Sequence, residues 1–271
     1  MEVDGRVAIV TGAASGIGAA LSAELVARGA RVVVADLDET ATARTAARLP
    51  EGSAVAVAGD TSDPAVIEAQ IAAAERAFGP VDLYFANAGI AGAAGLAATD
   101  EDWARALDVN LLAHVRAARA LVPGWVERGS GHFVTTASAA GLLSQIGSAT
   151  YSTTKHAAVG FAEWLSLTYG DDGVGVSCVC PMGVDTALLR PDRPVSDAEA
   201  LMLHTVESAG EVLDPADVAV MVLDAVAADR FLVLPHPEVL EMYRGKGADY
   251  GRWLAGMRRL QRGMRRSLPG G

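Results

Sequence analysis

The stretch Val7-Ala8-Ile9-Val10-Thr11-Gly12-Ala13-Ala14-Ser15-Gly16-Ile17-Gly18 decides the fold, because it joins an apolar run to a glycine-rich turn. The apolar run is short and continuous, as in a strand buried on both faces. The glycines allow a sharp turn and let a pyrophosphate approach the N-terminus of the following helix. We therefore predict cofactor binding by Gly12, Ser15, Gly16, Ile17 and Gly18. A tight turn that only caps a helix is the alternative.

Outward from this turn, strand-like and helix-like segments alternate along the chain. Apolar, β-branched runs follow at residues 31–35, 54–58, 81–86, 132–136, 174–179 and 231–234. Segments with helical spacing lie between them, at residues 17–28, 64–78, 101–126, 151–169 and 215–228. This alternation predicts an α/β fold with a parallel sheet covered by helices on both faces. No linker divides residues 1–271, so we expect a single domain.

Composition excludes several classes of protein. With 51% hydrophobic and 20% charged residues, the 271-residue chain can bury a core. A net charge of −11 disfavours nucleic-acid binding, and no apolar stretch is long enough for a membrane span. The acidic start of the chain is unlike a secretory signal, and Cys178 and Cys180 alternate within one apolar run, so we expect reduced thiols in a cytoplasmic protein. No histidine has partners at metal-site spacing; only His156 is expected near the chemistry, and no metal is assigned.

The second apolar run ends in Asp36, close to the offset at which an acid meets the adenosine ribose of a dinucleotide. A carboxylate can accept hydrogen bonds from both ribose hydroxyls but repels a 2′-phosphate. No basic residue stands at Ala14, Ser15 or Leu37 to offset that repulsion. We therefore predict NAD rather than NADP as the cofactor. The alternative is that Asp36 is only a turn residue at the strand end.

Tyr151 and Lys155 form the sequence Tyr151-Ser152-Thr153-Thr154-Lys155, in a chain with only two lysines. Residues four apart share one face of a helix. A nearby ammonium favours the phenolate, so we expect Lys155, with help from an oxidised nicotinamide, to lower the pKa of Tyr151 toward about 7, giving a general acid/base. Ser138 follows the run 132–136, at the end of a parallel strand where such sheets bind ligands. A plain surface pair and a turn-forming serine are the ordinary alternatives.

Together these residues resemble the short-chain dehydrogenase/reductase family, in its compact single-domain branch, over residues 7–235. The resemblance lies in the family's glycine turn, an acid after the third strand, an Asn-Ala-Gly sequence after the fourth, a helix asparagine and a Ser/Tyr/Lys set. These motifs fall at Thr11, Gly12, Gly16, Gly18, Asp60, Thr61, Asn87, Ala88, Gly89, Asn110, Ser138, Tyr151 and Lys155.

The resemblance implies a doubly wound, seven-stranded parallel Rossmann-type sheet and hydride transfer between nicotinamide C4 and a substrate carbon. It implies that Tyr151 exchanges a proton with the substrate oxygen, which Ser138 holds. Lys155 would bind the nicotinamide ribose, and Asn110 would position a water. Asp60 and Thr61 would lie at the adenine, and Asn87, Ala88 and Gly89 along the cofactor channel.

One position departs from the family pattern. The family usually has Pro-Gly-x-Val-x-Thr after the sixth strand, whereas this chain has Pro181-Met182-Gly183-Val184-Asp185-Thr186. Val184 and Thr186 resemble the residues that hold the nicotinamide carboxamide. We expect Met182 to reshape the pocket floor or the local backbone.

The substrate side is expected to be apolar. Candidate substrate-binding residues are Ser138, Tyr151, Leu142, Met182, Leu188 and Met202, with Ile90, Ala139, Gly141, Ile146, Leu189 and Leu203 nearby. No Arg or Lys stands beside Ser138 or Tyr151, so a hydrophobic secondary alcohol or its ketone is the predicted substrate. Residues 184–214 are irregular and are expected to form a substrate lid; a solvated insertion is the alternative. The candidate side chains could also belong to the core.

Residues 244–271 form a basic tail, with eight basic residues and one acid. Trp253, Met257, Leu260, Met264 and Leu268 recur at helical spacing, so we predict an amphipathic helix. We expect it to dock on the acidic body or on a neighbouring subunit; an anionic membrane surface and a disordered tail are the alternatives. The family resemblance implies a homo-oligomer, commonly a tetramer.

Two other functions use part of this pattern. A Rossmann methyltransferase also has a glycine turn and a ribose-binding acid, but it does not need Ser138, Tyr151 and Lys155 at these spacings. A non-catalytic NAD-sensing regulator would keep the fold and lose the catalytic set, which is intact here. The predicted function is therefore an NAD-dependent alcohol dehydrogenase/ketone reductase.

Overall fold

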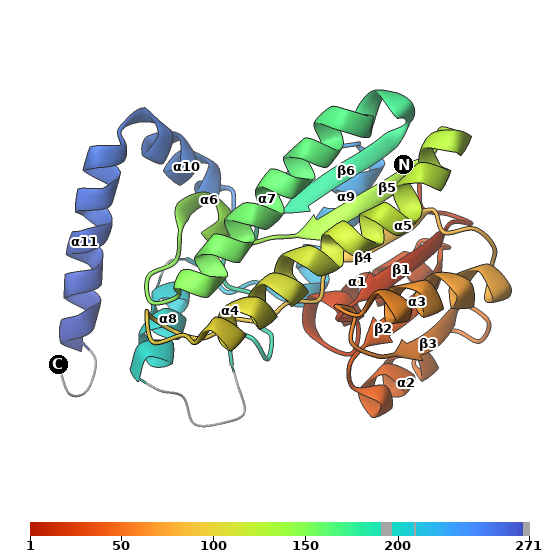
Figure 1. The fold of residues 1–271 in the computed structure, drawn as a ribbon, viewed down its shortest axis with the longest axis horizontal. Coiled ribbons are helices and arrows are strands. Elements are labelled where there is room, and N and C mark those ends of the chain that lie inside the picture. Colours follow the sequence, from red (N-terminus) through yellow and green to blue (C-terminus); the bar gives the residue numbers. More distant parts are fainter. Residues whose placement is uncertain (191–196, 209, 268–271) are drawn as a thin grey trace.

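Seven parallel strands form one sheet in the order β3-β2-β1-β4-β5-β6-β7 (Figure 1). The structure is a computed structural model that describes residues 1–190, 197–208 and 210–267. The strands are β1 (Val7–Thr11), β2 (Arg31–Asp36), β3 (Ala54–Ala58), β4 (Leu83–Ala86), β5 (Gly131–Thr136), β6 (Val174–Val179) and β7 (Leu232–Val233). The predicted α/β fold with a seven-stranded Rossmann-type sheet is confirmed.

Helices cover both faces of the sheet. They are α1 (Gly16–Ala27), α2 (Glu39–Ala47), α3 (Pro64–Ala77), α4 (Asp100–Leu107), α5 (Ala113–Arg128), α6 (Ala140–Leu143), α7 (Ala149–Tyr169), α8 (Asp197–Glu207), α9 (Pro215–Ala227), α10 (Glu238–Ala248) and α11 (Tyr250–Ser267). Two hydrophobic clusters form the core: one packs α3, α5 and α7 against one face, and the other packs α1 and α9 against the opposite face. Within β1, Ile9 belongs to the first cluster, and Ala8 and Val10 belong to the second, as strand alternation requires.

The predicted helix over residues 101–126 is divided into three parts. Thr99 begins α4 with a capping box, in which its hydroxyl accepts from the Asp102 N–H and the Asp102 carboxylate accepts from the Thr99 N–H. A π-helical turn, η1 (Asp108–Leu112), then separates α4 from α5. Such turns are rare and occur frequently at functional sites, and this one contains Asn110. The apolar spacing of the sequence did not predict the wider turn.

The topology directs the site to one edge of the sheet. Strand order reverses beside β1, whose neighbours are β2 and β4, and ligands of open α/β sheets bind outside the carboxyl ends at such a point. The chain beyond β7 forms α10 and α11, and these helices lie at the same end of the molecule as α6 and α8 (Figure 1). A second short helix, η2 (Gly170–Asp172), joins α7 to β6. In the part of the chain that the structure describes, no helix has the length and apolar character that crossing a bilayer requires.

Candidate active site

A cavity of about 930 Å³ lies at the carboxyl ends of the strands. Most of the predicted site residues line it: Gly12, Ser15, Gly16, Ile17, Asp36, Asp60, Thr61, Asn87, Ala88, Gly89, Ser138, Tyr151, Lys155, Met182, Val184, Thr186, Leu188 and Met202. Ile90, Ala139, Leu189 and Leu203 line it as well. Five predicted residues, Gly18, Asn110, Gly141, Leu142 and Ile146, are not part of the lining. The topology thus brings residues from both ends of the chain together around one space.

The glycine turn packs backbone against backbone. A Cβ on Gly18 would lie 2.1 Å from the Gly12 carbonyl oxygen, and a Cβ on Gly12 would lie 2.9 Å from the Cα of Ala88. Gly18 therefore maintains the turn without facing the cavity. The Ser15 side chain makes no capping hydrogen bond, so the N–H groups at the start of α1 are not occupied by that hydroxyl. This turn and helix terminus fit an anionic pyrophosphate.

Hydrogen bonds connect the turn to the strand beside it. Thr11 Oγ1 accepts from the N–H groups of Asn87 (3.0 Å) and Ala88 (3.1 Å) and donates to the Phe85 carbonyl oxygen (3.1 Å). The Asn87 amide donates to the Thr11 carbonyl oxygen (3.0 Å). These bonds hold the Asn-Ala-Gly segment against the end of β1, at the topological switch point.

Two carboxylates stand where the adenosine half of a dinucleotide would lie. Asp36 accepts from the N–H groups of Ala14 (3.0 Å) and Leu37 (2.7 Å), so its carboxylate is held at the end of β2. Asp60 accepts from Ser62 and pairs with Arg105 at 2.7 Å. Partial burial alone would raise the pKa of Asp60, but the Ser62 hydrogen bonds and the Arg105 cation outweigh it and lower that pKa. The donor and acceptor set of this end of the cavity fits a dinucleotide.

Tyr151, Ser138 and Lys155 meet at the centre of the cavity lining. Ser148 caps α7 by accepting from the Tyr151 N–H (3.2 Å), which fixes the first turn of the helix. The Ser138 hydroxyl is close enough to the Tyr151 phenol to act on it as a hydrogen-bonding group. The Lys155 ammonium, 3% exposed, lies 5.6 Å from the centroid of the Tyr151 ring and donates to the Thr136 carbonyl oxygen at 2.8 Å.

Burial dominates the electrostatics of these groups. It raises the pKa of Tyr151, and the Ser138 hydroxyl, as a hydrogen-bonding group, offsets part of that increase. Burial also lowers the pKa of Lys155 to about 8. The protein's own groups therefore do not lower the pKa of Tyr151, because desolvation of the phenol dominates. The lowering expected with an oxidised nicotinamide stays a prediction. Any further shift of Tyr151 must come from charge added to the cavity.

The buried ammonium of Lys155 has a measurable consequence for stability. Because its folded pKa of about 8 lies below the ordinary 10.5, the unfolded chain binds more protons between these values, and the contribution of Lys155 to stability rises with pH there. We expect the difference in Tm between the two proteins, wild type minus Lys155→Met, to increase from pH 8 to 10.5. Thermal unfolding of both proteins across pH 7–11 checks this, and a difference that is constant with pH would contradict it.

Asn110 is fully buried and joins two segments of the site. Its Oδ1 accepts from the Ile90 N–H (2.9 Å), and its Nδ2 donates to the Ile90 carbonyl oxygen (2.9 Å) and to Thr154 Oγ1 (3.1 Å). It therefore connects the loop after β4 to Thr154 on α7. Its side chain is part of the support of the cavity rather than its surface.

His114 lies one helical turn after Asn110, and sequence reasoning missed it. The imidazole is buried, and within the described residues neither ring nitrogen has a hydrogen-bond partner. Burial, together with the charge of Lys155, lowers the pKa of His114 to about 3, so the ring is neutral at physiological pH. The expectation that only His156 lies near the chemistry is therefore wrong. The i, i+4 spacing from Asn110 was the signal that could have identified it.

Met182 is accommodated without strain. It does not have a positive φ, the conformation that would require glycine, and its N–H donates to Nδ1 of the buried His236 at 3.1 Å. Nε2 of His236 lies 3.0 Å from the Glu211 carbonyl oxygen, which can only accept, so Nε2 carries the proton. Met182 thus adds an apolar side chain to the cavity lining. The hydrogen bond to His236 holds its backbone in place.

Leu142 is a correction to the predicted substrate side. Its side chain, on the short helix α6, lies in the core cluster formed with α5 and α7 and is 3% exposed. Gly141 and Ile146 do not line the cavity either. Gly141 instead allows close helix packing, because a Cβ there would lie 2.5 Å from the Lys155 carbonyl oxygen. The next three residues, Leu143, Ser144 and Gln145, line the cavity instead of Leu142.

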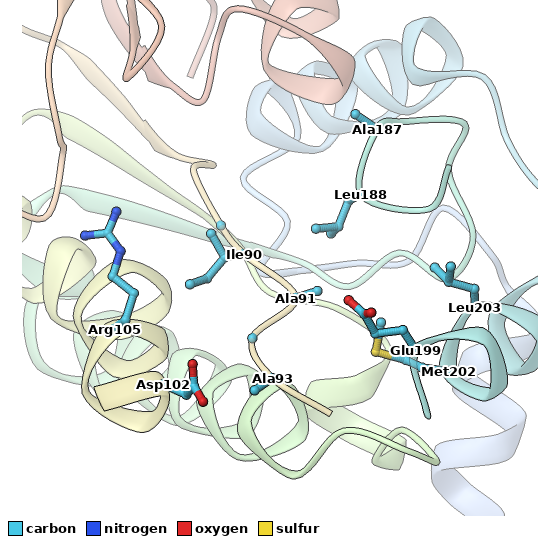
Figure 2. A pocket seen from close by; sticks show the side chains of 12 residues that line it. Ile90, Ala91, Ala93, Asp102, Arg105, Ala187, Leu188, Glu199, Met202 and Leu203 are labelled. Atoms are coloured by element: carbon cyan, nitrogen blue, oxygen red, sulfur yellow. The ribbon is translucent and has the colours of Figure 1, made fainter. Parts of the chain in front are cut away.

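A second pocket of about 460 Å³ adjoins the main cavity and shares several lining residues with it. Figure 2 shows Asp102 and Arg105 on α4, Leu188 in the loop after β6, and Glu199 and Met202 on α8. Arg105 is engaged by Asp60, as described above. Three charged side chains, Asp102, Arg105 and Glu199, therefore line this second pocket.

The structure also adds a wall that sequence reasoning did not assign to the site. Met242 of α10 and Trp253, Met257, Leu260 and Met264 of α11 line the main cavity. The amphipathic pattern of the tail identified the apolar face of α11 but not the space that it faces. Leu268, which continues that pattern, lies outside the described residues. Among the residues described, three or more His, Cys, Asp or Glu side chains nowhere gather in a way that could hold a metal ion.

Comparison with known proteins identifies the family. The family model of the short chain dehydrogenases matches residues 6–196. The chain is 36% identical over 258 residues to 1-deoxy-11-beta-hydroxypentalenate dehydrogenase from Streptomyces exfoliatus, covering 93% of this chain and 90% of the relative. It is 37% identical to momilactone A synthase from Oryza sativa subsp. japonica, with 84% and 83% covered. A crystal structure of a short chain dehydrogenase/reductase from Burkholderia phymatum in complex with NAD superposes with a TM-score of 0.84, at 33% identity over 92% of this chain and 95% of that one. The glycine turn, the Tyr/Lys helix and the seven-stranded sheet thus occur together in a chain that belongs to the short-chain dehydrogenase/reductase family of oxidoreductases.

Proposed function

We propose that this protein is an NAD-dependent alcohol dehydrogenase/ketone reductase that acts on hydrophobic secondary alcohols or their ketones. The observation that carries the proposal is the shared cavity: the glycine turn and Asp36 line one end, Ser138, Tyr151 and Lys155 the middle, and apolar side chains the other end. A cofactor and an apolar substrate would meet at the phenol. Membership of this family argues against the methyltransferase alternative.

The residues that would hold NAD follow from the lining. The N-terminus of α1, with Gly12, Gly16 and Ile17, would hold the pyrophosphate, and Asp36 the adenosine ribose. Asp60 and Thr61 would lie at the adenine, Asn87, Ala88 and Gly89 along the channel, and Val184 and Thr186 at the carboxamide. Bound NAD would supply the hydride acceptor, and NADH the donor.

The chain's own residues would handle the proton and the substrate oxygen. Tyr151 would donate its phenolic proton to a carbonyl oxygen in reduction and take the hydroxyl proton in oxidation. Ser138, which lies beside Tyr151 in the cavity lining, would donate to the same oxygen as negative charge develops there. Lys155 would hold the nicotinamide ribose, and its positive charge would favour the phenolate once the cavity is filled. Asn110 would support this arrangement by fixing the Ile90 loop to α7.

The apolar end of the cavity favours an uncharged substrate. Among the described lining residues, none of those from Pro181 onward is charged. An anionic substrate would find no cation there to pair with, and desolvating it would be costly. The similarity to 1-deoxy-11-beta-hydroxypentalenate dehydrogenase supports an alcohol substrate for this chain.

A direct assay tests the proposal. Purified protein is mixed with NAD and a panel of secondary alcohols, and absorbance of reduced nicotinamide is followed. We expect turnover of apolar cyclic or aryl alcohols in preference to small polyols and acyl thioesters. NAD binding without turnover of any alcohol or ketone would favour the regulator instead.

Exposed apolar side chains on α7 support the proposal of a homo-oligomer. Trp164 and Leu167 are 51% and 87% exposed on its outer face. Apolar side chains exposed side by side on one helix are typical of an association surface. Light scattering would measure whether the assembly is the expected tetramer.

A further inference from the structure

The C-terminal helix α11 has two chemically distinct faces. Trp253, Met257 and Met264 are at least half-buried and, with Leu260, line the main cavity. The opposite side carries six exposed arginines, Arg252, Arg258, Arg259, Arg262, Arg265 and Arg266. Solvation of the arginines and burial of the apolar stripe therefore favour the same orientation of the helix. This orientation places the apolar stripe on the cavity.

The start of α11 is held by a buried lysine. Lys246 of α10 is 6% exposed, and its ammonium donates to the Leu142 carbonyl oxygen (2.5 Å) at the end of α6. It also lies 3.4 Å from Nε2 of His156, on α7. Nδ1 of His156 is 2.8 Å from the Ser152 carbonyl oxygen and must carry the proton, so Nε2 offers a lone pair to Lys246. One ammonium thus joins the tail to α6, which follows Ser138, and to α7, which carries Tyr151.

The other end of α11 is seated on α8. Met264 is 8% exposed, and its Sδ lies 3.3 Å from Thr205 Oγ1. Thr205 in turn donates to the Leu201 carbonyl oxygen (2.7 Å). Since Met202 and Leu203 of the same helix line the cavity, α8 and α11 form adjoining parts of one wall.

The composition of this wall indicates the class of ligand that it would contact. Five of the seven methionines of the chain, Met182, Met202, Met242, Met257 and Met264, line this one cavity. Thioether side chains are flexible and polarizable and adapt to bulky apolar shapes. The parts of this wall that come from α8, α10 and α11 lie beyond residue 196, where the match to the family model ends.

We propose that α11 is the outer wall of the substrate site, that Trp253 and Met257 select bulky apolar substrates, and that Lys246 is a positioning residue that seats the helix. The inference rests on the proposed function and specifies its substrate class. A small alcohol beside Tyr151 would leave most of the cavity unfilled. A polycyclic one would extend toward Trp253 and gain contact with it.

The test compares a steroid alcohol with cyclohexanol as substrates. Removing apolar contacts from a pocket changes kcat/KM by about 10–200-fold for the substrate that uses them. We expect Trp253→Ala and Met257→Ala each to lower the ratio of kcat/KM for the steroid alcohol to that for cyclohexanol at least tenfold. Leu254→Ala is the matched control, since Leu254 is on the same helix, 52% exposed and outside the lining. An unchanged ratio, or an equal change in all three variants, would overturn the proposal.

A binding readout keeps this inference separate from the proposed function. If wild type oxidises no secondary alcohol, the function fails, and the wall is then tested by fluorescence titration with Nile red, an apolar probe. Weaker probe binding in Trp253→Ala and Met257→Ala than in Leu254→Ala supports the wall. Equal binding in all variants rejects it. NAD affinity, measured in each variant, confirms that the dinucleotide end is folded.

The role of Lys246 has its own variants. We expect Lys246→Met to raise KM for the steroid alcohol more than it changes kcat for either substrate. Lys246→Arg, which keeps a cationic donor toward the Leu142 carbonyl oxygen, should restore part of the selectivity. An equal loss of kcat with both substrates in Lys246→Met would show that Lys246 does not act through α11.

Discussion

Tyr151→Phe is expected to lower kcat by about 10²–10⁴-fold, the range in which a positioned general acid or base contributes. The change removes one oxygen and leaves the ring, so the packing of α7 and the glycine turn should persist. NAD affinity, measured by fluorescence titration, is expected to stay within about twofold of wild type, since the turn and Asp36 are untouched. Equal kcat in both proteins would overturn the assignment of the proton donor.

The matched control is Tyr169→Phe. Tyr169 lies at the far end of the same helix and stacks edge-on against Trp164. Losing this second hydroxyl should leave kcat unchanged. A comparable loss in both variants would mean that the effect of the Tyr151 substitution is a general destabilisation of α7.

The pH dependence provides a separate check on Tyr151. Because burial raises the pKa of Tyr151, the phenol is protonated at neutral pH in the field of the protein's own groups. A protonated phenol can donate to a ketone but cannot accept a proton from an alcohol. In wild type, kcat/KM for alcohol oxidation should therefore rise with pH above neutrality, and the rate of ketone reduction should fall. Residual activity of Tyr151→Phe should lack this dependence.

Replacing Asp36 is expected to invert the cofactor preference. Wild type should favour NAD over NADP at least tenfold, because a carboxylate about 4 Å from a 2′-phosphate is repelled by up to about 4 kcal/mol at an effective dielectric of 20. Asp36→Ala removes both this repulsion and the acceptors for the ribose hydroxyls. Adding Leu37→Arg places a cation at a position that is 65% exposed at the same strand end. The double variant should prefer NADP, a change in the Kd ratio of about 10²–10³-fold.

Glu39→Ala is the matched control for charge. Glu39 is an exposed acid in the first turn of α2, three residues beyond Asp36, and its loss lowers the negative charge of the same region by the same amount. Its cofactor preference should equal that of wild type. Isothermal titration with both dinucleotides measures the ratios. A wild type that prefers NADP, or a double variant with an unchanged ratio, would contradict the role given to Asp36.

The fold could be predicted because its signals are local. A continuous apolar run followed by glycines at fixed spacing predicts β1 and α1. A strand buried on both faces requires apolar residues, and the close approach of backbone segments in the turn requires glycine. Elements that depend on distant packing were predicted less well. The π-helical turn at Asp108–Leu112 has ordinary helical spacing in the sequence, so the sequence does not distinguish it from a regular helix. In the structure this turn packs against α7, a contact between distant parts of the chain.

The candidate site divides in the same way. Ser138, Tyr151, Lys155 and the glycine turn were found from motif spacing, and the structure brings them to one cavity. The direction of the Tyr151 pKa was not predictable, because it depends on how much solvent the folded chain removes from the phenol. Leu142 was misplaced for a related reason: an apolar side chain beside a site can face the core or the cavity, and sequence alone does not distinguish them.

By itself, the sequence determined the alternation of strands and helices, the dinucleotide turn, the acid at the end of β2 and the Tyr/Lys pair, because each depends on neighbours within a few residues. Only the tertiary structure decided what the tail does. Lys246 and Leu142 are about 100 residues apart in the chain, and the hydrogen bond between them exists because α10 folds back onto α6. The apolar stripe of α11 faces the main cavity for the same reason. The side chains that line this cavity with it come from α8, from α10 and from the loops after distant strands. Burial of the stripe among these side chains fixes the position of α11 at the cavity.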